Sequence, residues 1–334
     1  MELHVSFTAL FFMITAEEAA NIVIHSTGIA CENINKFSHE VLRTRGGRFG
    51  SGMGGLLEAL WGYYINQALL KTGNETPECE IAWLSDHEYN DFACILRDQN
   101  WLSATKTGEL FRIEAKSMNS GVDESKGHFD EIVVHLQEWD LLLVLIWSWD
   151  SADEFRVYPH IKDYFIGRAA PIALLRDKLH IARRGTFVSR MNCPDGCLPD
   201  VCKHHGEPLN ASGNRERRSG PISCRSATAS YAQNFGGLVR MLKTDSEAAR
   251  RIFREIRVTD SIAHDYISFI HRNFPDEEKN QYLTAEWKQA AQLLGINTAR
   301  LSKTEVIQKV RAIANYQNAL RDLYRPQHPP LFSA

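Results

Sequence analysis

Residues 111–118, FRIEAKSM, place an acid and a lysine two positions apart. Apolar and polar side chains alternate along the stretch: Phe111, Ile113 and Ala115 against Arg112, Glu114 and Lys116. Because successive side chains of a β-strand point to opposite faces, this period of two predicts a strand with one packed face and one polar face. Glu114 and Lys116 then lie side by side on the polar face.

A second carboxylate, Asp91, opens the strand-like run DFACIL. A turn-rich stretch separates it from Glu114, so the two runs are predicted to be neighbouring strands joined by a hairpin excursion. That pairing would bring Asp91 close to Glu114 and Lys116. The long gap leaves Asp86 and Glu88 as alternatives to Asp91.

The chemistry of these three side chains is that of a metal-assisted hydrolase. Two close carboxylates repel each other unless a cation lies between them. Mg²⁺ prefers oxygen ligands, and a lysine beside it can orient an attacking water and stabilise charge on a phosphate. The alternative is a surface strand bearing an ion pair, which contributes little to stability.

Another acid, Glu58, lies in the otherwise apolar run LLEALWGYYINQALL, which is predicted to be a helix. It is a candidate accessory acid for the same site. The alternative is that an acid near the start of a helix is favoured by the helix dipole.

The elements that must position these residues alternate between strands and helices in the first half of the chain. We expect helices at 15–45, 56–70, 123–139 and 168–184, strands at 81–84, 91–96, 110–117, 140–149 and 155–161, and helices from 228 onward. This order predicts an α/β fold with a central mixed sheet flanked by helices.

Asp91 followed by Glu114-Ala115-Lys116, with a helix before them and a helix and an apolar strand after them, resembles the PD-(D/E)XK nuclease superfamily over about residues 50–160. By length and appended regions the chain looks most like a type II restriction endonuclease. The resemblance implies a restriction-endonuclease-like sheet, Mg²⁺ held by Asp91 and Glu114, and a catalytic role for Lys116 assisted by Glu58. The chain departs from the pattern at Asn90, where the name-giving proline would stand.

A cysteine cluster follows at 193–204, with the spacing C-x3-C-x4-C-x-H. Its candidate ligands for a structural Zn²⁺ are Cys193, Cys197, Cys202 and His204. Cys224 is an alternative to the histidine, and the alternative to zinc is a set of buried or free thiols. Seven cysteines, an odd number, with no secretion signal predict a reducing cytoplasm.

Positive charge is concentrated between residues 160 and 225, which include 12 Lys and Arg but only 6 Asp and Glu. The region is therefore +6, although the whole chain is −3. This asymmetry predicts a basic face for a polyanion, with solvated loops as the alternative. The candidate DNA contacts are Arg183, Arg184, Arg190, Arg215, Arg217 and Arg218, of which the last three lie in the glycine-flanked loop GNRERRSGP.

These features predict three regions: a nuclease core with a helical lead at 1–185, a Cys/Arg-rich DNA-contacting segment at 186–226, and a helical region at 227–334. We expect double-stranded DNA as the substrate, a homodimer on a palindromic site, no membrane association, and a cognate DNA methyltransferase as functional partner. The alternatives are a repair or recombination nuclease on the same core, and a zinc-containing DNA-binding protein without catalysis.

Overall fold

The computed structural model describes the chain with several gaps. The described residues are 14–45, 52–71, 78–84, 90–97, 99–121, 127–129, 131–188, 206, 208–209, 235, 237–243, 246–274 and 284–323.

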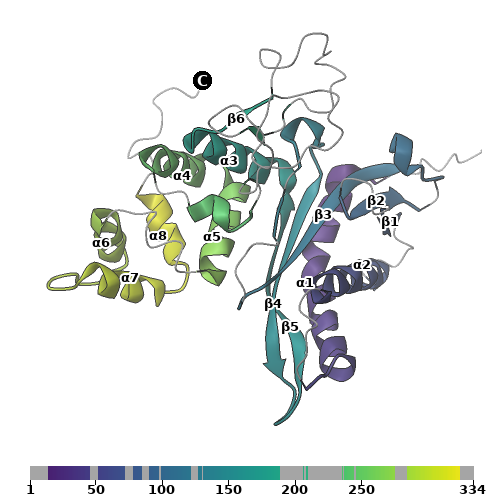
Figure 1. Ribbon diagram of the computed structural model, residues 1–334, viewed down its shortest axis with the longest axis horizontal. Coiled ribbons are helices and arrows are strands. Elements are labelled where there is room, and N and C mark those ends of the chain that lie inside the picture. Colours follow the sequence, from purple (N-terminus) through teal and green to yellow (C-terminus); the bar gives the residue numbers. More distant parts are fainter. Residues whose placement is uncertain are drawn as a thin grey trace, which may run out of the picture.

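A five-stranded mixed sheet forms the centre of the molecule (Figure 1). Its strands lie in sequence order: β1 (Cys79–Trp83), β2 (Phe92–Leu96), β3 (Glu109–Asn119), β4 (Leu141–Ser151) and β5 (Val157–Arg168). Strands β1, β2 and β3 form an antiparallel meander, β4 runs parallel to β3, and β5 returns antiparallel to β4. The predicted α/β class with a mixed sheet flanked by helices is confirmed.

One face of the sheet is covered by α1 (Ala16–Val41) and α2 (Met53–Lys71). Helix α1 begins with the capping box that Thr15 and Glu18 form. The apolar side chains of β3 that alternation assigns to this face, Phe111, Ile113 and Ala115, are fully buried there. The packed face predicted for the strand is therefore present.

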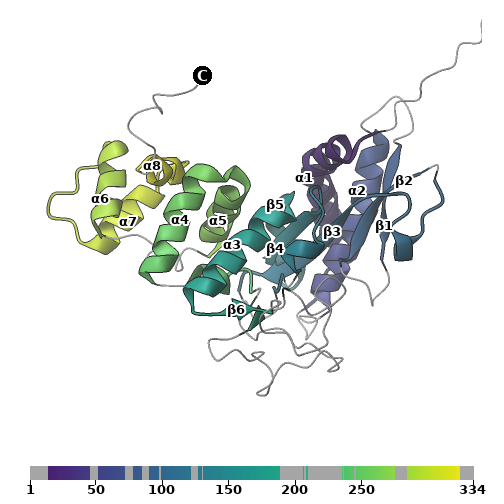
Figure 2. The same cartoon turned by 90° about the horizontal axis from the view of Figure 1, so that it is seen from above.

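The opposite face is covered by α3 (Ala169–Ala182), α4 (Glu247–Thr259) and α5 (Ser261–Asn273). Leu142 and Val144 of β4 are buried on this side with Phe253 of α4. Strand β4 thus packs on both faces, which explains why its sequence is a continuous apolar run. Figure 2 shows the sheet between its two helical layers.

Three more helices form a separate apolar cluster around Trp287: α6 (Thr284–Leu293), α7 (Lys303–Arg311) and α8 (Tyr316–Asp322). They lie beyond α4 and α5, on the side away from the sheet (Figure 2). A capping box formed by Ser302 and Glu305 starts α7. An ion pair of 3.1 Å between Arg254 and Glu286 joins α4 to α6.

The helix expected at 123–139 is wrong for the residues that the structure describes there. Residues 127–129 and 131–140 contain one 3-10 turn, Val133–His135, and are otherwise irregular. Three successive β-branched residues, 132–134, disfavour a helix. The Asp140 carboxylate also accepts the backbone N–H of Gln137 at 2.8 Å, which fixes a turn before β4.

Two short strands, β6 (Thr186–Phe187) and β7 (Pro208–Leu209), pair antiparallel and bring together the chain on either side of the cysteine cluster. The cluster itself lies outside the described residues. Where the chain is described, no helix combines the length and the apolar character that crossing a membrane would require.

Candidate active site

Asp91 and Glu114 face each other across two neighbouring strands. Phe92 pairs with Ile113, so continuing the antiparallel register places Asp91 opposite Glu114. The Asp91 N–H donates to the Ile113 carbonyl at 3.1 Å. Its Oδ2 accepts the Ala115 N–H at 2.8 Å. One backbone and one side-chain hydrogen bond to β3 therefore hold Asp91 beside Glu114.

Asn90, directly before this aspartate, has a φ of +74°. Proline cannot adopt this conformation because its ring holds φ near −65°. Asparagine tolerates it better than most residues with a side chain. The absence of proline at position 90 therefore agrees with the backbone conformation that places Asp91 beside β3.

Lys116 lies between the two carboxylates. Its Nζ is 2.5 Å from Glu114 Oε1 and 3.7 Å from Asp91 Oδ2. Burial lowers the pKa of Lys116, but the charges of Glu114 and Asp91 outweigh it and the net shift is upward. Lys116 therefore stays protonated, and its side chain, 22% exposed, remains within reach of solvent.

Glu58, on α2, interacts with Asp91 and Lys116. Burial, assisted by the charge of Asp91, raises the pKa of Glu58 to about 7, against opposing effects of Lys116 and Ser117. The helix can come this close because Gly54 faces Ser117: a Cβ on Gly54 would lie 2.6 Å from the Ser117 Oγ. A glycine one turn before Glu58 thus lets α2 reach β3.

Glu131 is a carboxyl group that the sequence did not single out. It is 8% exposed, and its pKa is raised to about 7 by burial and then by the charges of Glu114 and Asp140. It stands in the segment that was expected to be a helix, so its position depends on the irregular path before β4. The only signal in the sequence was an acid beside the apolar residues 132–134.

Glu58, Asp91 and Glu114 are thus electrostatically coupled to Lys116, and Glu131 is coupled to Glu114. In the part of the chain that the structure describes, no set of three or more His, Cys, Asp or Glu side chains is arranged to hold a metal ion. Mg²⁺ needs fewer protein ligands, because it usually keeps several waters and binds one or two carboxylates. Asp91 and Glu114 fit that requirement.

The predicted DNA contacts are only partly described. The Arg183 guanidinium donates to the Met241 carbonyl at 2.9 Å, so it also supports the turn after α3. Arg184 ends that turn in a left-handed conformation, with φ +69°. The other predicted contacts and zinc ligands lie outside the described residues: Arg190, Arg215, Arg217, Arg218, Cys193, Cys197, Cys202 and His204.

Comparison with models of protein families, with curated proteins and with solved structures found no match to this chain.

Proposed function

We propose that this protein is a Mg²⁺-dependent endonuclease that hydrolyses phosphodiester bonds at a specific sequence of double-stranded DNA, in the manner of a type II restriction enzyme. The observation that carries the proposal is the position of Lys116, 2.5 Å from Glu114 and 3.7 Å from Asp91 on adjacent strands. The antiparallel meander followed by the parallel apolar strand β4 also supports the order of strands on which the resemblance rests, whereas the helix expected between β3 and β4 is replaced, in the described residues, by an irregular segment with one 3-10 turn.

Each side chain has a role in this reaction. Asp91 and Glu114 would hold Mg²⁺, which when bound polarises the phosphate and lowers the pKa of a coordinated water. Lys116 stays protonated, so it serves as a hydrogen-bond donor that orients the attacking water and stabilises charge on the phosphate. Glu58 carries a raised pKa near neutrality, which allows it to accept a proton from that water.

The proposal includes a homodimer, because a two-fold symmetric DNA site is matched by a two-fold symmetric protein. It also includes a structural Zn²⁺ in the cysteine cluster and base contacts from the glycine-flanked arginine loop. Elemental analysis tests the zinc: about one zinc per chain is expected, and none in protein purified without chelators would reject the zinc site.

Digestion of a sequenced supercoiled plasmid tests the activity. We expect discrete bands with Mg²⁺ and none with EDTA. A smear or structure-dependent nicking would instead support a repair or recombination nuclease. Retarded migration without cutting, in every divalent metal tried, would support a DNA-binding protein and reject the enzyme.

A further inference from the structure

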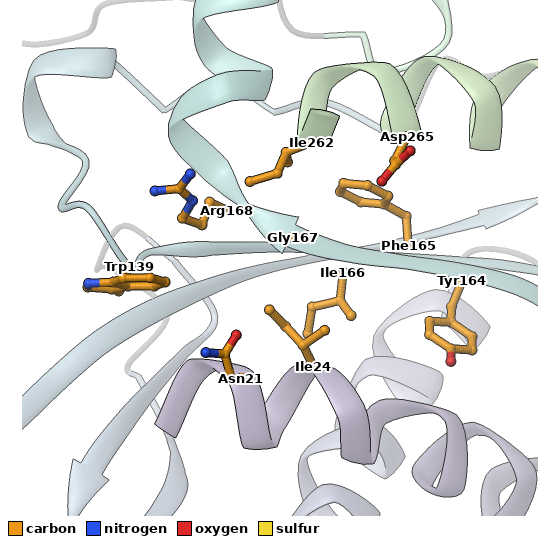
Figure 3. Close-up of a pocket in the computed structure, with 10 residues that line it drawn as sticks. All are labelled: Asn21, Ile24, Trp139, Tyr164, Phe165, Ile166, Gly167, Arg168, Ile262 and Asp265. Atoms are coloured by element: carbon orange, nitrogen blue, oxygen red, sulfur yellow. The ribbon is translucent and has the colours of Figure 1, made fainter. Parts of the chain in front are cut away.

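A groove of about 420 Å³ lies along the end of β5, and none of the residues that line it belongs to the candidate active site (Figure 3). Residues 164–168 of β5 form its floor. Asn21 and Ile24 of α1 form one wall, and Ile262 and Asp265 of α5 form the other. The volume lies within the range of sites that bind ligands in proteins.

The floor of the groove is the edge of the sheet. In the described part of the chain β5 has a full strand neighbour on one side only, β4. Farther back along β5, other parts of the chain already occupy the open side. Val157 exchanges two backbone hydrogen bonds of 2.8 Å with Thr44. Ile161 exchanges two with the Asn35 side-chain amide, at 2.7 and 3.0 Å, as it would with a neighbouring strand.

Within the groove, the Tyr164 N–H donates to the Asp163 Oδ1 at 2.9 Å, whereas the described residues place no such partner beside Ile166. The Ala169 N–H donates to the Asp140 carbonyl at 2.7 Å, and antiparallel pairs alternate between bonded and non-bonded. From the register, Gly167 and Phe165 therefore bond to β4, and Ile166 turns its N–H and C=O away from β4 into the groove. Unpaired backbone groups at a sheet edge are a template for an added strand.

The side chains around this edge suit an extended peptide. Ile24 and Ile166 lie on the α1 side, and Ile262 and Phe165 on the α5 side, so both faces of an added strand would meet apolar groups (Figure 3). The edge is also recessed between two helices. A second folded sheet that carried its own flanking helices would collide with these walls, whereas a single extended segment fits between them.

Two charged side chains line the groove, Arg168 and Asp265, and the Asp265 Oδ1 already lies 3.3 Å from the His264 Nδ1. Arg168 therefore indicates which charge the bound segment carries. The Arg168 guanidinium lies over the Trp139 ring, 5.4 Å from its centroid. Within the described residues no carboxylate forms an ion pair with it, whereas Arg156 and Arg176 each pair with an aspartate. A carboxylate on the ligand would complete this site, because arginine binds carboxylates through well-directed hydrogen bonds.

We propose that the edge of β5 between α1 and α5 binds an extended peptide segment of a partner protein, which adds a strand to the sheet beside Ile166 and places a carboxylate on Arg168. About four to six residues would span the floor at roughly 3.3 Å each. The carboxylate belongs either to an acidic side chain or to the C-terminus of the segment.

Fluorescence anisotropy with the full-length protein tests the proposal. The probes are fluorescein-labelled hexapeptides of alternating valine and threonine in three forms: ending in glutamate amide, ending in a free carboxylate, or uncharged. We expect the two acidic forms to bind at least about tenfold more tightly than the uncharged form, and the tighter of the two identifies the source of the carboxylate. Hydrogen exchange across 164–168 should slow on binding.

Two variants and a control make the result specific. Arg168→Gln should weaken acidic peptides about tenfold and leave the uncharged one unchanged. Ile262→Trp should fill the groove and weaken all three. Arg156→Gln, at an exposed arginine paired with Asp153 before β5, should change nothing.

Binding of no peptide, or binding that neither variant weakens, would overturn the proposal. So would self-association of the protein that Ile262→Trp abolishes, because the edge would then belong to a second copy of the chain.

Discussion

Strand β3 carries two charged clusters, centred on residues four positions apart, that differ in how completely their charges are paired. The first is centred on Arg112, which is 7% exposed. Its Nε and Nη2 donate to the two carboxylate oxygens of Glu109 at 2.8 and 2.9 Å, and its Nη2 also donates to the Ser103 carbonyl. Glu109 in turn accepts from the Trp101 Nε1 at 3.0 Å. One cation and one anion are thus matched in a bidentate pair.

The second cluster is centred on Lys116 and is not balanced. Lys116 interacts with the three carboxyls of Glu58, Asp91 and Glu114, and the pKa of Glu58 is raised to about 7. Glu131 interacts with Glu114 and also with Arg176 and Lys106, and its pKa is likewise raised to about 7. The Asp91 side chain is 40% exposed, so solvent and ions can reach the group. Crowded carboxylates with too little positive charge are costly for stability, and such groups occur where function requires them. The difference between the two groups supports a structural role for the Arg112 cluster and the catalytic role that we propose for the Lys116 cluster.

The largest effect is expected from removing a carboxylate of the Lys116 cluster. Asp91→Asn should lower the rate of Mg²⁺-dependent DNA cleavage by about 10³-fold, because it removes charge where the metal and the transition state need it. The matched control is Asp150→Asn, which changes a strand carboxylate paired with Lys162 at 2.6 Å. Equal rates for Asp91→Asn and the control in plasmid cleavage would remove Asp91 from the site.

A substitution in the Arg112 cluster should lower the stability of the fold and leave the rate of DNA cleavage unchanged. Arg112→Met leaves the Glu109 carboxylate buried without its cation, so the free energy of unfolding should fall by about 3–5 kcal/mol in urea denaturation. Arg97→Met is the control: its pair with Glu80, at 3.3 Å, is more exposed, and the loss should stay below about 1 kcal/mol. Similar losses in both variants would contradict the distinction between the clusters.

A smaller effect, an increase in the free energy of unfolding, is expected from replacing Glu131. Its pKa is raised from 4.5 to about 7 on folding, so the folded state binds more protons than the unfolded state between these values. Stability therefore falls as the pH rises through this window. Glu131→Gln removes the cost and should be more stable than the wild type by on the order of 1–3 kcal/mol at pH 8, with no difference near pH 4.

This difference should be measured by denaturant unfolding at several pH values in EDTA, so that no metal contributes. Glu138→Gln, at an exposed position in the same segment, provides the control. A stability difference for Glu131→Gln that does not change with pH would show that the carboxyl is not under electrostatic strain.

Local patterns predicted the strand that carries the site, because alternation along β3 depends only on which face is packed. They also predicted that Asp91 would meet Glu114, since two strands joined by an excursion pair in the simplest antiparallel way. The approach of Glu131 was not predictable in this manner. It depends on an irregular segment held by tertiary contacts, such as the bond from Arg176 to the Phe129 carbonyl at 2.8 Å.

The groove on β5 could not be predicted from the sequence either. The strand was expected to end at residue 161, but β5 continues to Arg168. Its open edge becomes visible only when α1, from the start of the chain, and α5, from its last third, are placed on either side (Figure 3). Contacts between segments this far apart have no local signature.

The catalytic role proposed for the Lys116 cluster is tested most directly by single-turnover cleavage of DNA by Lys116→Ala, with Lys162→Ala as control. Lysine 162 is also a strand lysine paired with an aspartate, at 2.6 Å. We expect Lys116→Ala to abolish cleavage in Mg²⁺ and to keep DNA binding within about tenfold, because the lysine acts mainly on the transition state. Full cleavage by Lys116→Ala would contradict the assignment of this site.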